Sequence, residues 1–173
     1  MIKEIDVKNV QEKWGKGIVK IGEAKDNRQE CEKAANGLLD ELYAFDLGEV
    51  LFKPTKVEEV QFRPDKESAL SYFIGGNKKY SEDKGFAITP FTNVKFENKH
   101  FVLEEDRAIA MGNYYFTTTD GSVVKVEYTF GYKLYNGALK IDLHHSSIPY
   151  SETYQNLCEA QKQLTLKLIK ENS

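Results

Sequence analysis

The chain has 173 residues, with 24 lysine and arginine residues against 27 aspartate and glutamate residues, and a formal net charge of −3. This length suits one domain with a full hydrophobic core and is short for two. Charges of both signs are scattered along the chain without a basic stripe, so we expect no nucleic-acid partner. No apolar run is long enough to cross a membrane, so we expect no membrane partner either.

The sequence as it stands predicts a cytoplasmic protein. Segment 1–6 contains no apolar stretch resembling a signal peptide, although a plastid or periplasmic targeting peptide removed earlier would leave no trace. The two cysteines, Cys31 and Cys158, lie far apart in helix-like segments and form no disulfide framework. This cysteine usage fits a reducing compartment.

Two amphipathic helices, or one bent helix, are expected at the start of the chain. Apolar residues recur at helical spacing over 7–21 and, after a break at Asp26-Asn27, again over 31–42. Gly15 and Gly17 lie inside the first of these helices, and each costs about 1 kcal/mol against alanine in a helix interior. That cost is offset only where something packs closely against the glycines.

Short elements follow the two helices. The apolar runs 50–53 and 60–63 are each stopped by a proline, which predicts two short strands with Thr55 in the loop between them. Arg63, at the end of the second run, is expected to be a buried ion-pair partner. A short capped helix over 68–74 comes next.

From residue 87 onward the pattern changes to strands separated by polar turns. Strands are expected over 93–97, 100–103, 108–118, 123–134 and 138–148. Asp120-Gly121 and Asn136-Gly137 favour tight hairpin turns, because these residue types tolerate positive φ. The sheet should therefore be an antiparallel meander, and apolar residues at helical spacing predict a final helix at about 151–170.

This order of elements predicts an α+β fold and a single domain over residues 1–173. Helices followed by a curved antiparallel sheet are the order of the cone-shaped fold shared by nuclear-transport-factor-like proteins. We expect the N-terminal helices to pack on the concave face of the sheet. Such an arrangement leaves a cavity at the open end of the cone.

The most informative segment is the run His144-His145-Ser146-Ser147-Ile148-Pro149-Tyr150, which closes the last expected strand and holds two of the three histidines. The apolar residues of 139–143 occupy odd positions, and His145 and Ser147 continue that face. The alternation predicts that His145 and Ser147 line a pocket wall. It directs His144 and Ser146 to the opposite face.

Six segments of the chain, taken in order, resemble the iota-class carbonic anhydrases. They are Gln11-x-x-Trp14-x-x-Gly17-Ile18-Val19-x-Ile21-Gly22, Leu51-Phe52-Lys53-Pro54-Thr55, Phe62-Arg63, Ser71-Tyr72-Phe73-Ile74-Gly75-Gly76, Glu82-Asp83-x-Gly85-Phe86-Ala87-Ile88 and His144-His145-Ser146-Ser147. The resemblance spans residues from about 10 to 150. The domain of this class is similar to the association domain of calcium/calmodulin-dependent protein kinase II.

The resemblance implies an enzyme, a carbonate hydro-lyase that reversibly hydrates carbon dioxide to bicarbonate in a cone-shaped pocket. In the family, a threonine after the Phe-Lys-Pro run, a tyrosine in Ser-Tyr-Phe, and a histidine and a serine of the terminal motif surround bicarbonate. These match Thr55, Tyr72, His145 and Ser147 here as catalytic residues. The three hydroxyl residues among them would also bind the substrate.

The chemistry requires a deprotonated water, a small dry slot for carbon dioxide, and hydrogen-bond donors for the charge that grows on its oxygens. A zinc site would need three protein ligands. His144 and His145 alternate across the strand and His100 starts another strand, so the sequence favours a site without metal or other cofactor. Zinc and manganese stay as alternatives, because the family is described as heterogeneous on this point.

Without a metal, hydroxyls and one imidazole must hold and polarise the water. The sequence assigns His145 to tune or relay the proton, since an unperturbed histidine titrates near pH 6.5. Thr55, Tyr72 and Ser147 would donate to bicarbonate oxygens and orient the attacking water. The assignment leaves open which of these groups is the base.

Two other function classes fit the same fold. One is a non-catalytic, oligomerising association-type domain, and the other is an isomerase or dehydratase. The second would need an inward carboxylate base, and Asp142 falls on the face opposite the apolar one. A curved open sheet of this kind usually buries its convex face against another copy, so we expect a homodimer.

Overall fold

The structure is a computed structural model that describes residues 1–151, 159 and 162. Its elements are α1 (Glu4–Glu23), α2 (Arg28–Leu42), β1 (Leu51–Lys53), α3 (Lys66–Ile74), the 3₁₀ helix η1 (Lys78–Tyr80), β2 (Phe91–Leu103), β3 (Arg107–Thr118), β4 (Val123–Tyr135) and β5 (Ala138–Ser147). Cys158 and most of the helix expected at about 151–170 lie outside the described residues. Within those residues, no helix has the length and apolar character needed to span a bilayer.

The expected helices at 7–21 and 31–42 are confirmed as α1 and α2. The side chain of Asn27 accepts a hydrogen bond from the backbone N–H of Glu30 and so caps α2 where the break was predicted. Close packing accounts for Gly15, since a Cβ there would lie 3.1 Å from the carbonyl oxygen of Val94 in β2. The backbone of α1 therefore approaches the sheet directly.

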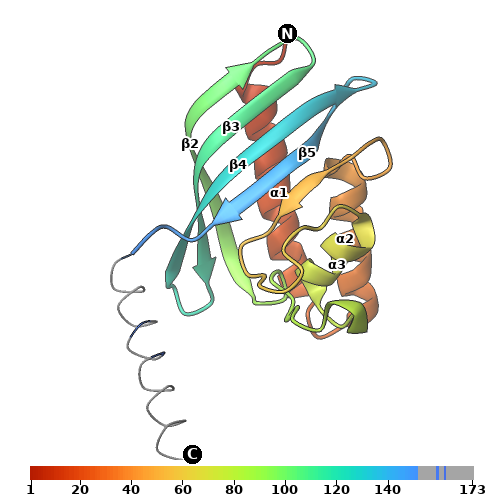
Figure 1. Ribbon diagram of the computed structural model, residues 1–173, viewed down its shortest axis with the longest axis vertical. Helices are drawn as coiled ribbons and strands as arrows, with labels where there is room; N and C mark the ends of the chain where they lie inside the picture. The colour runs from red at the N-terminus through yellow and green to blue at the C-terminus, as the bar shows by residue number, and fades with distance from the viewer. Residues whose placement is uncertain (152–158, 160–161, 163–173) are drawn as a thin grey trace, which may run out of the picture.

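The five strands form one open, curved sheet in the order β1-β5-β4-β3-β2, in which β1 pairs with β5 in parallel and the other pairs are antiparallel. In Figure 1, α1 crosses one face of this sheet, and α2 and α3 lie beside it near β1. The predicted α+β fold with helices on one face of a curved sheet is confirmed. The core lies between that face and the helices.

Two details of the strand prediction differ from the structure. The expected strands 93–97 and 100–103 are one strand, β2, with a register shift between Asn98 and His100. The strand expected at 60–63 is wrong, since this segment is irregular. It is held instead by the backbone N–H of Arg63, which donates to the carbonyl oxygen of Phe52 at 2.8 Å.

The tight turn between β4 and β5 is confirmed. Asn136 and Gly137 have φ values of 49° and 84°, the pair of positive values that this kind of hairpin turn requires. The turn fixes the register at the start of β5, where Ala138 pairs with Tyr135 and Leu139 with Leu134. The first half of β5 thus follows the predicted alternation, and Ile141 is fully buried.

A β-bulge in the middle of β5 reverses the alternation. Tyr132 pairs with Ile141 and Gly131 pairs with Leu143, so Asp142 is an extra residue without a partner. One inserted residue moves every later side chain to the other face of the sheet. The predicted orientation of the closing motif is therefore wrong, because His144 and Ser146 are the buried residues, each 2% exposed.

The bulge depends on a glycine in the neighbouring strand. A Cβ on Gly131 would lie 2.8 Å from the Cβ of Leu143 and 3.0 Å from a carboxylate oxygen of Asp142. The other carboxylate oxygen of Asp142 accepts a hydrogen bond from Arg107 of β3. The bulge is thus stabilised by an ion pair and requires a position without a side chain opposite it.

Replacement of this glycine should destabilise the domain. Gly131→Ala is expected to lower the free energy of unfolding by about 1–3 kcal/mol, because the added methyl group has no room beside the bulge. Gly37→Ala is the matched control, since a Cβ at this exposed position of α2 meets no atom within 4 Å. The control should raise stability by about 0.5–1 kcal/mol. Denaturant unfolding measures both, and equal stability of the two variants would contradict the bulge account.

Candidate functional site

A group of polar side chains is buried on the inner face of the sheet, within the aromatic core. His144 and Ser146 come from β5 and Tyr114 from β3, while Tyr43 follows the C-terminus of α2 and Tyr72 lies on α3. Each of these five side chains is at most 5% exposed. Buried polar groups are favourable only when hydrogen-bonded, so their partners determine the site.

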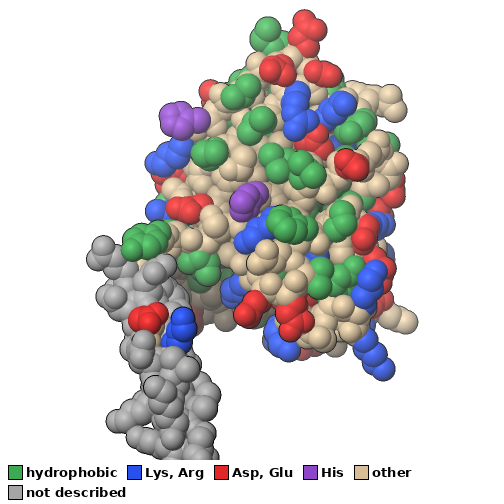
Figure 2. Space-filling model, in the orientation of Figure 1, with side chains coloured by type: hydrophobic (Ala, Val, Ile, Leu, Met, Phe, Trp, Pro, Cys, Tyr) green, Lys and Arg blue, Asp and Glu red, His purple; other side chains and the backbone are tan. Residues whose placement is uncertain are grey.

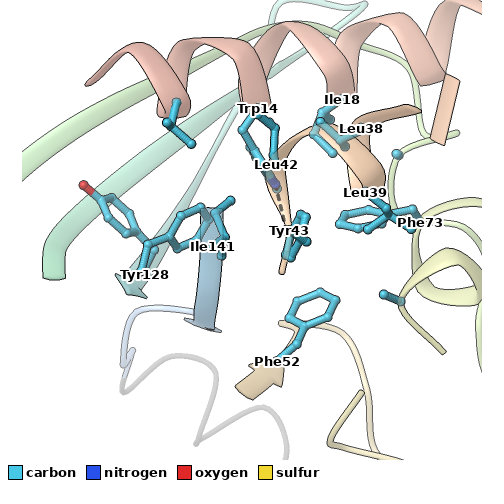
Figure 3. Close-up of a cluster of buried hydrophobic side chains, with 14 of the residues drawn as sticks. Trp14, Ile18, Leu38, Leu39, Leu42, Tyr43, Phe52, Phe73, Tyr128 and Ile141 are labelled. Carbon is cyan, nitrogen blue, oxygen red and sulfur yellow. Dashed lines mark hydrogen bonds between the residues drawn. The ribbon is translucent and has the colours of Figure 1, made fainter. Parts of the chain in front are cut away.

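One side of the His144 ring is tied to the helices. The indole N–H of Trp14 donates to the Tyr43 hydroxyl at 2.9 Å, a bond that is drawn in Figure 3. The same hydroxyl lies 2.7 Å from Nδ1 of His144. Neither Trp14 nor Tyr43 was expected at the site, since Trp14 has the spacing of an ordinary core residue.

The other side of the ring meets a set of hydroxyls. Nε2 of His144 lies 3.0 Å from Oγ of Ser146 and 3.4 Å from the Tyr114 hydroxyl. Tyr114 and Ser146 are in turn hydrogen-bonded at 2.6 Å. The imidazole therefore connects Tyr43 with the hydroxyls of Tyr114 on β3 and Ser146 on β5.

Thr55 and Tyr72 extend this set of hydroxyls. Burial raises the pKa of Tyr72, and hydrogen bonds from the backbone of Lys56 and Thr55 and from the Thr55 side chain partly counteract the rise. Burial likewise raises the pKa of Tyr114, against which hydrogen bonds to Ser146 and Thr55 act. Thr55 therefore acts on both phenols, and the structure brings Thr55 and Tyr72 close together.

Aromatic rings surround His144 and keep it neutral. Its ring stacks on Phe52 at 4.7 Å between centroids and contacts Phe130 at 4.0 Å, with Trp14 edge-on at 5.6 Å. Burial among these rings holds the pKa of His144 well below its ordinary value of 6.5, and the neighbouring His145 acts in the same direction. The imidazole is therefore uncharged near neutral pH.

A small cavity opens beside Tyr72, with a volume of about 110 Å³. Its other lining residues are Lys56, Glu82, Asp83, Lys84, Gly85, Phe86 and Thr89. Drug-sized ligands occupy pockets of about 300–1,000 Å³, so this cavity suits a molecule of only a few atoms.

A buried ion pair fixes one wall of this cavity. Arg63 is fully buried and donates to both carboxylate oxygens of Asp83, at 2.7 and 2.8 Å. Ser71 of α3, next to Tyr72, donates to the same carboxylate at 2.5 Å. The expected role of Arg63 as an ion-pair partner is confirmed, and the pair joins the cavity loop to the helix that carries Tyr72.

His145 and Ser147 lie on the outer face of the sheet, away from Tyr72. His145 is exposed, and Oγ of Ser147 donates to Glu127 of β4 at 3.0 Å. Both residues line an outer groove of about 460 Å³ together with Met111 and Thr129. The sequence placed these two residues on the pocket wall, and the bulge at Asp142 is the reason why they face outward instead.

The described part of the chain contains no group of three or more histidine, cysteine, aspartate or glutamate side chains that could hold a metal ion. The buried site instead offers hydroxyl groups and one neutral imidazole. Such groups can donate hydrogen bonds to the oxygens of a small anion and can pass protons between neighbouring oxygens. The site is therefore suited to chemistry on a small molecule rich in oxygen.

Comparison with known proteins gives consistent results. The family model for metal-independent carbonic anhydrase matches residues 5–148. A protein named metal-independent carbonic anhydrase from Nostoc sp. (strain PCC 7120) is 34% identical over 155 residues, which cover 87% of this chain and 76% of that protein.

Solved structures agree with this match. The crystal structure of the iota-carbonic anhydrase from a cyanobacterium, complexed with bicarbonate, has a TM-score of 0.84 at 34% identity and covers 87% of this chain and 94% of that one. A calcium/calmodulin-dependent protein kinase II association domain from Xanthomonas campestris has a TM-score of 0.56 at 24% identity, with 86% and 89% of the two chains covered. The second likeness concerns the fold alone.

The buried imidazole predicts a dependence of stability on pH. Because the pKa of His144 is lowered from 6.5 by folding, the unfolded chain takes up a proton below pH 6.5 that the folded chain does not bind. The stabilisation from this group is present above pH 6.5 and is lost as the pH falls, at about 1.4 kcal/mol per pH unit.

Denaturant unfolding of the wild type and of His144→Gln about one pH unit below 6.5, where the unfolded imidazole is mostly protonated, measures this slope. We expect the variant to lose it, whereas the exposed His100→Gln should keep the wild-type slope. A wild-type slope in His144→Gln would show that another group titrates in this range.

Proposed function

Since the chain belongs to the metal-independent carbonic anhydrase family, we propose that it catalyses the reversible hydration of carbon dioxide to bicarbonate at the buried hydroxyl site. The substrate site comprises Thr55, Tyr72, Tyr114, His144 and Ser146. His144 and Ser146 replace His145 and Ser147 of the sequence-based assignment. The bicarbonate complex of the cyanobacterial relative supports the choice of ligand.

A connected set of four hydroxyls, which meets a cavity of about 110 Å³ at Tyr72, is the observation that carries the proposal. When water adds to the carbon of carbon dioxide, a C–O bond forms and negative charge develops on the substrate oxygens. A hydroxyl donor held in place beside one of those oxygens would stabilise the transition state with little reorganisation. The small cavity also limits the water that could compete for the same donors.

The proton released by the attacking water cannot be stored at this site. Burial holds the pKa of His144 well below 6.5 and raises the pKa values of Tyr72 and Tyr114. A charged imidazolium and a charged phenolate are therefore both unfavourable there. The connected hydroxyls instead pass the proton onward toward solvent as bicarbonate forms.

We propose that the reaction needs no metal. The name of the family and of the curated relative supports this. Protein from which metal has been removed, with its residual metal content measured, should show full activity in stopped-flow hydration of carbon dioxide. Activity that disappears with a chelator and returns with zinc or manganese would contradict the metal-free site.

Adjacent serines provide the most selective test of the site. Ser146→Ala should lower kcat/KM for hydration by about 100-fold, the typical loss for one transition-state donor. Ser147→Ala is the matched control on the outer face and should stay close to the wild type. Stopped-flow assays of both variants measure this, and the reverse order would reinstate the pair His145 and Ser147.

A second comparison concerns α3. Tyr72→Phe removes only a hydroxyl and should lower kcat/KM by a similar factor of about 100. Tyr80→Phe, on η1 and stacked against Arg63, is a control for loss of a tyrosine hydroxyl nearby. A wild-type protein that hydrates carbon dioxide no faster than buffer would instead favour a non-catalytic association-type domain.

We also propose that the outer face of the sheet joins two copies in a homodimer. Met111 and Val102 are 53% and 55% exposed on this face, and Figure 2 shows hydrophobic side chains there between charged ones of both signs. Lys99 and Glu127 border the outer groove, so the face can complement itself across a two-fold axis.

Sedimentation of the wild type and of Met111→Glu tests the dimer. We expect a wild-type dimer and a variant shifted toward monomer, because the new charge would be buried in the contact. A monomeric wild type at the concentrations of the activity assay would overturn the homodimer.

A further inference from the structure

We propose that Trp14 and Tyr43 are positioning residues that hold His144 with its proton on Nε2, so that the imidazole donates a hydrogen bond into the hydroxyl cluster instead of acting as the base. The catalytic part of this inference rests on the proposed function. The assignment of the proton to Nε2 rests on the hydrogen bonds alone.

The argument begins with the indole of Trp14, which can donate a hydrogen bond and cannot accept one. Its N–H points at the Tyr43 oxygen, 2.9 Å away. Tyr43 accepts this bond and still has its own proton to place. Within the described part of the chain, the one acceptor found for that proton is Nδ1 of His144, at 2.7 Å.

Tyr43 is 2% exposed, so a hydroxyl proton without an acceptor would be costly there. If Nδ1 of His144 carried a proton, that proton and the Tyr43 proton would compete for the same contact. The favourable arrangement is a Tyr43 hydroxyl that donates to an unprotonated Nδ1. Because burial keeps the imidazole neutral, its single proton then lies on Nε2.

The groups that face His144 from the packed elements are uncharged. They are Trp14 of α1, Tyr43, Phe52 of β1, Tyr114 of β3, Phe130 of β4 and Ser146 of its own strand. None of these provides a counter-charge for an imidazolium. The hydrogen bond from Tyr43 therefore determines which nitrogen is protonated.

With its proton on Nε2, His144 donates to Oγ of Ser146 at 3.0 Å. Thr55, Tyr72, Tyr114 and Ser146 supply four hydroxyl protons, and three hydrogen bonds are enough to connect their four oxygens. If Nε2 of His144 accepted a hydrogen bond instead, the fourth hydroxyl proton would be used to donate to it. Because the imidazole donates, one hydroxyl proton is left for an oxygen of the molecule in the cavity.

Because they keep this donor free, Trp14 and Tyr43 contribute to substrate recognition without contacting the substrate. They set the direction of the hydrogen bonds so that the cluster keeps one donor free for an anion. Bicarbonate has an oxygen acceptor to receive it. His144 is then an orienting donor, and the proton of the attacking water passes to another acceptor.

Nitrogen NMR of the histidine rings measures the tautomer directly. In a His100→Gln/His145→Gln background, His144 is the single histidine, and we expect a pyridine-type 15N signal at Nδ1 and a pyrrole-type signal at Nε2 at neutral pH. A pyrrole-type Nδ1, or two equivalent imidazolium signals, would overturn the inference. This result does not depend on catalytic activity, so it can fail or hold separately from the proposed function.

Two variants in the same background test the cause. Tyr43→Phe removes the donor to Nδ1, and Trp14→Phe frees the Tyr43 hydroxyl to accept, so both should give a mixture of tautomers. We expect kcat/KM in carbon dioxide hydration to fall by about 10- to 100-fold, as for other partners that orient a histidine. Unfolding by denaturant confirms that each variant is folded.

Tyr132→Phe is the matched control. Tyr132 is fully buried in β4, and its hydroxyl has no hydrogen-bond partner of normal geometry within the described residues. The control should keep the wild-type tautomer and activity. If the tautomer stays pure in Tyr43→Phe and Trp14→Phe, the two residues are structural and the inference is wrong.

Discussion

The bulge at Asp142 is the constraint on which the site depends. It determines which half of the closing motif faces the core, because each residue after it lies on the opposite face from the one that simple alternation gives. Gly131 makes room for it, and Arg107 pairs with the extra carboxylate. Without this single inserted residue, the imidazole and the serine hydroxyl would point to solvent.

The aromatic core around the site has a chemical consequence as well as a structural one. Phe52, Phe130 and Trp14 exclude water from His144, so its charged form is disfavoured. The same burial disfavours phenolate at Tyr72 and Tyr114. The site thus keeps its groups neutral and acts through the direction of their hydrogen bonds, which suits the binding of an anion and the transfer of a proton.

Much of the fold followed from local patterns in the sequence. The two helices and the hairpin at Asn136-Gly137 were predicted, because side-chain periodicity and turn chemistry depend on neighbouring residues. Thr55 and Tyr72, which the resemblance assigned to the site, lie close together. The motif at the end of β5 was assigned to the wrong face, since strict alternation cannot anticipate an inserted residue. Gly131, an isolated glycine within a strand pattern, was the available signal for a bulge.

The roles of Trp14 and Tyr43 were harder to obtain from sequence. Trp14 has the spacing of a core residue, and Tyr43 ends a helix about one hundred residues before the histidine to which it bonds. Only the packing of α1 and α2 against the sheet joins them, as Figure 3 shows for the two rings. Hydrogen-bond direction is a property of the assembled core, and no local pattern encodes it.

The central claim is that the inner half of the closing motif contacts the substrate. The most direct measurement follows the histidine 15N signals of the wild-type protein during titration with bicarbonate. The account predicts that the Nε2 signal of His144 shifts with saturation while the signals of His145 stay in place. A saturable shift of His145 with an unchanged His144 would contradict it.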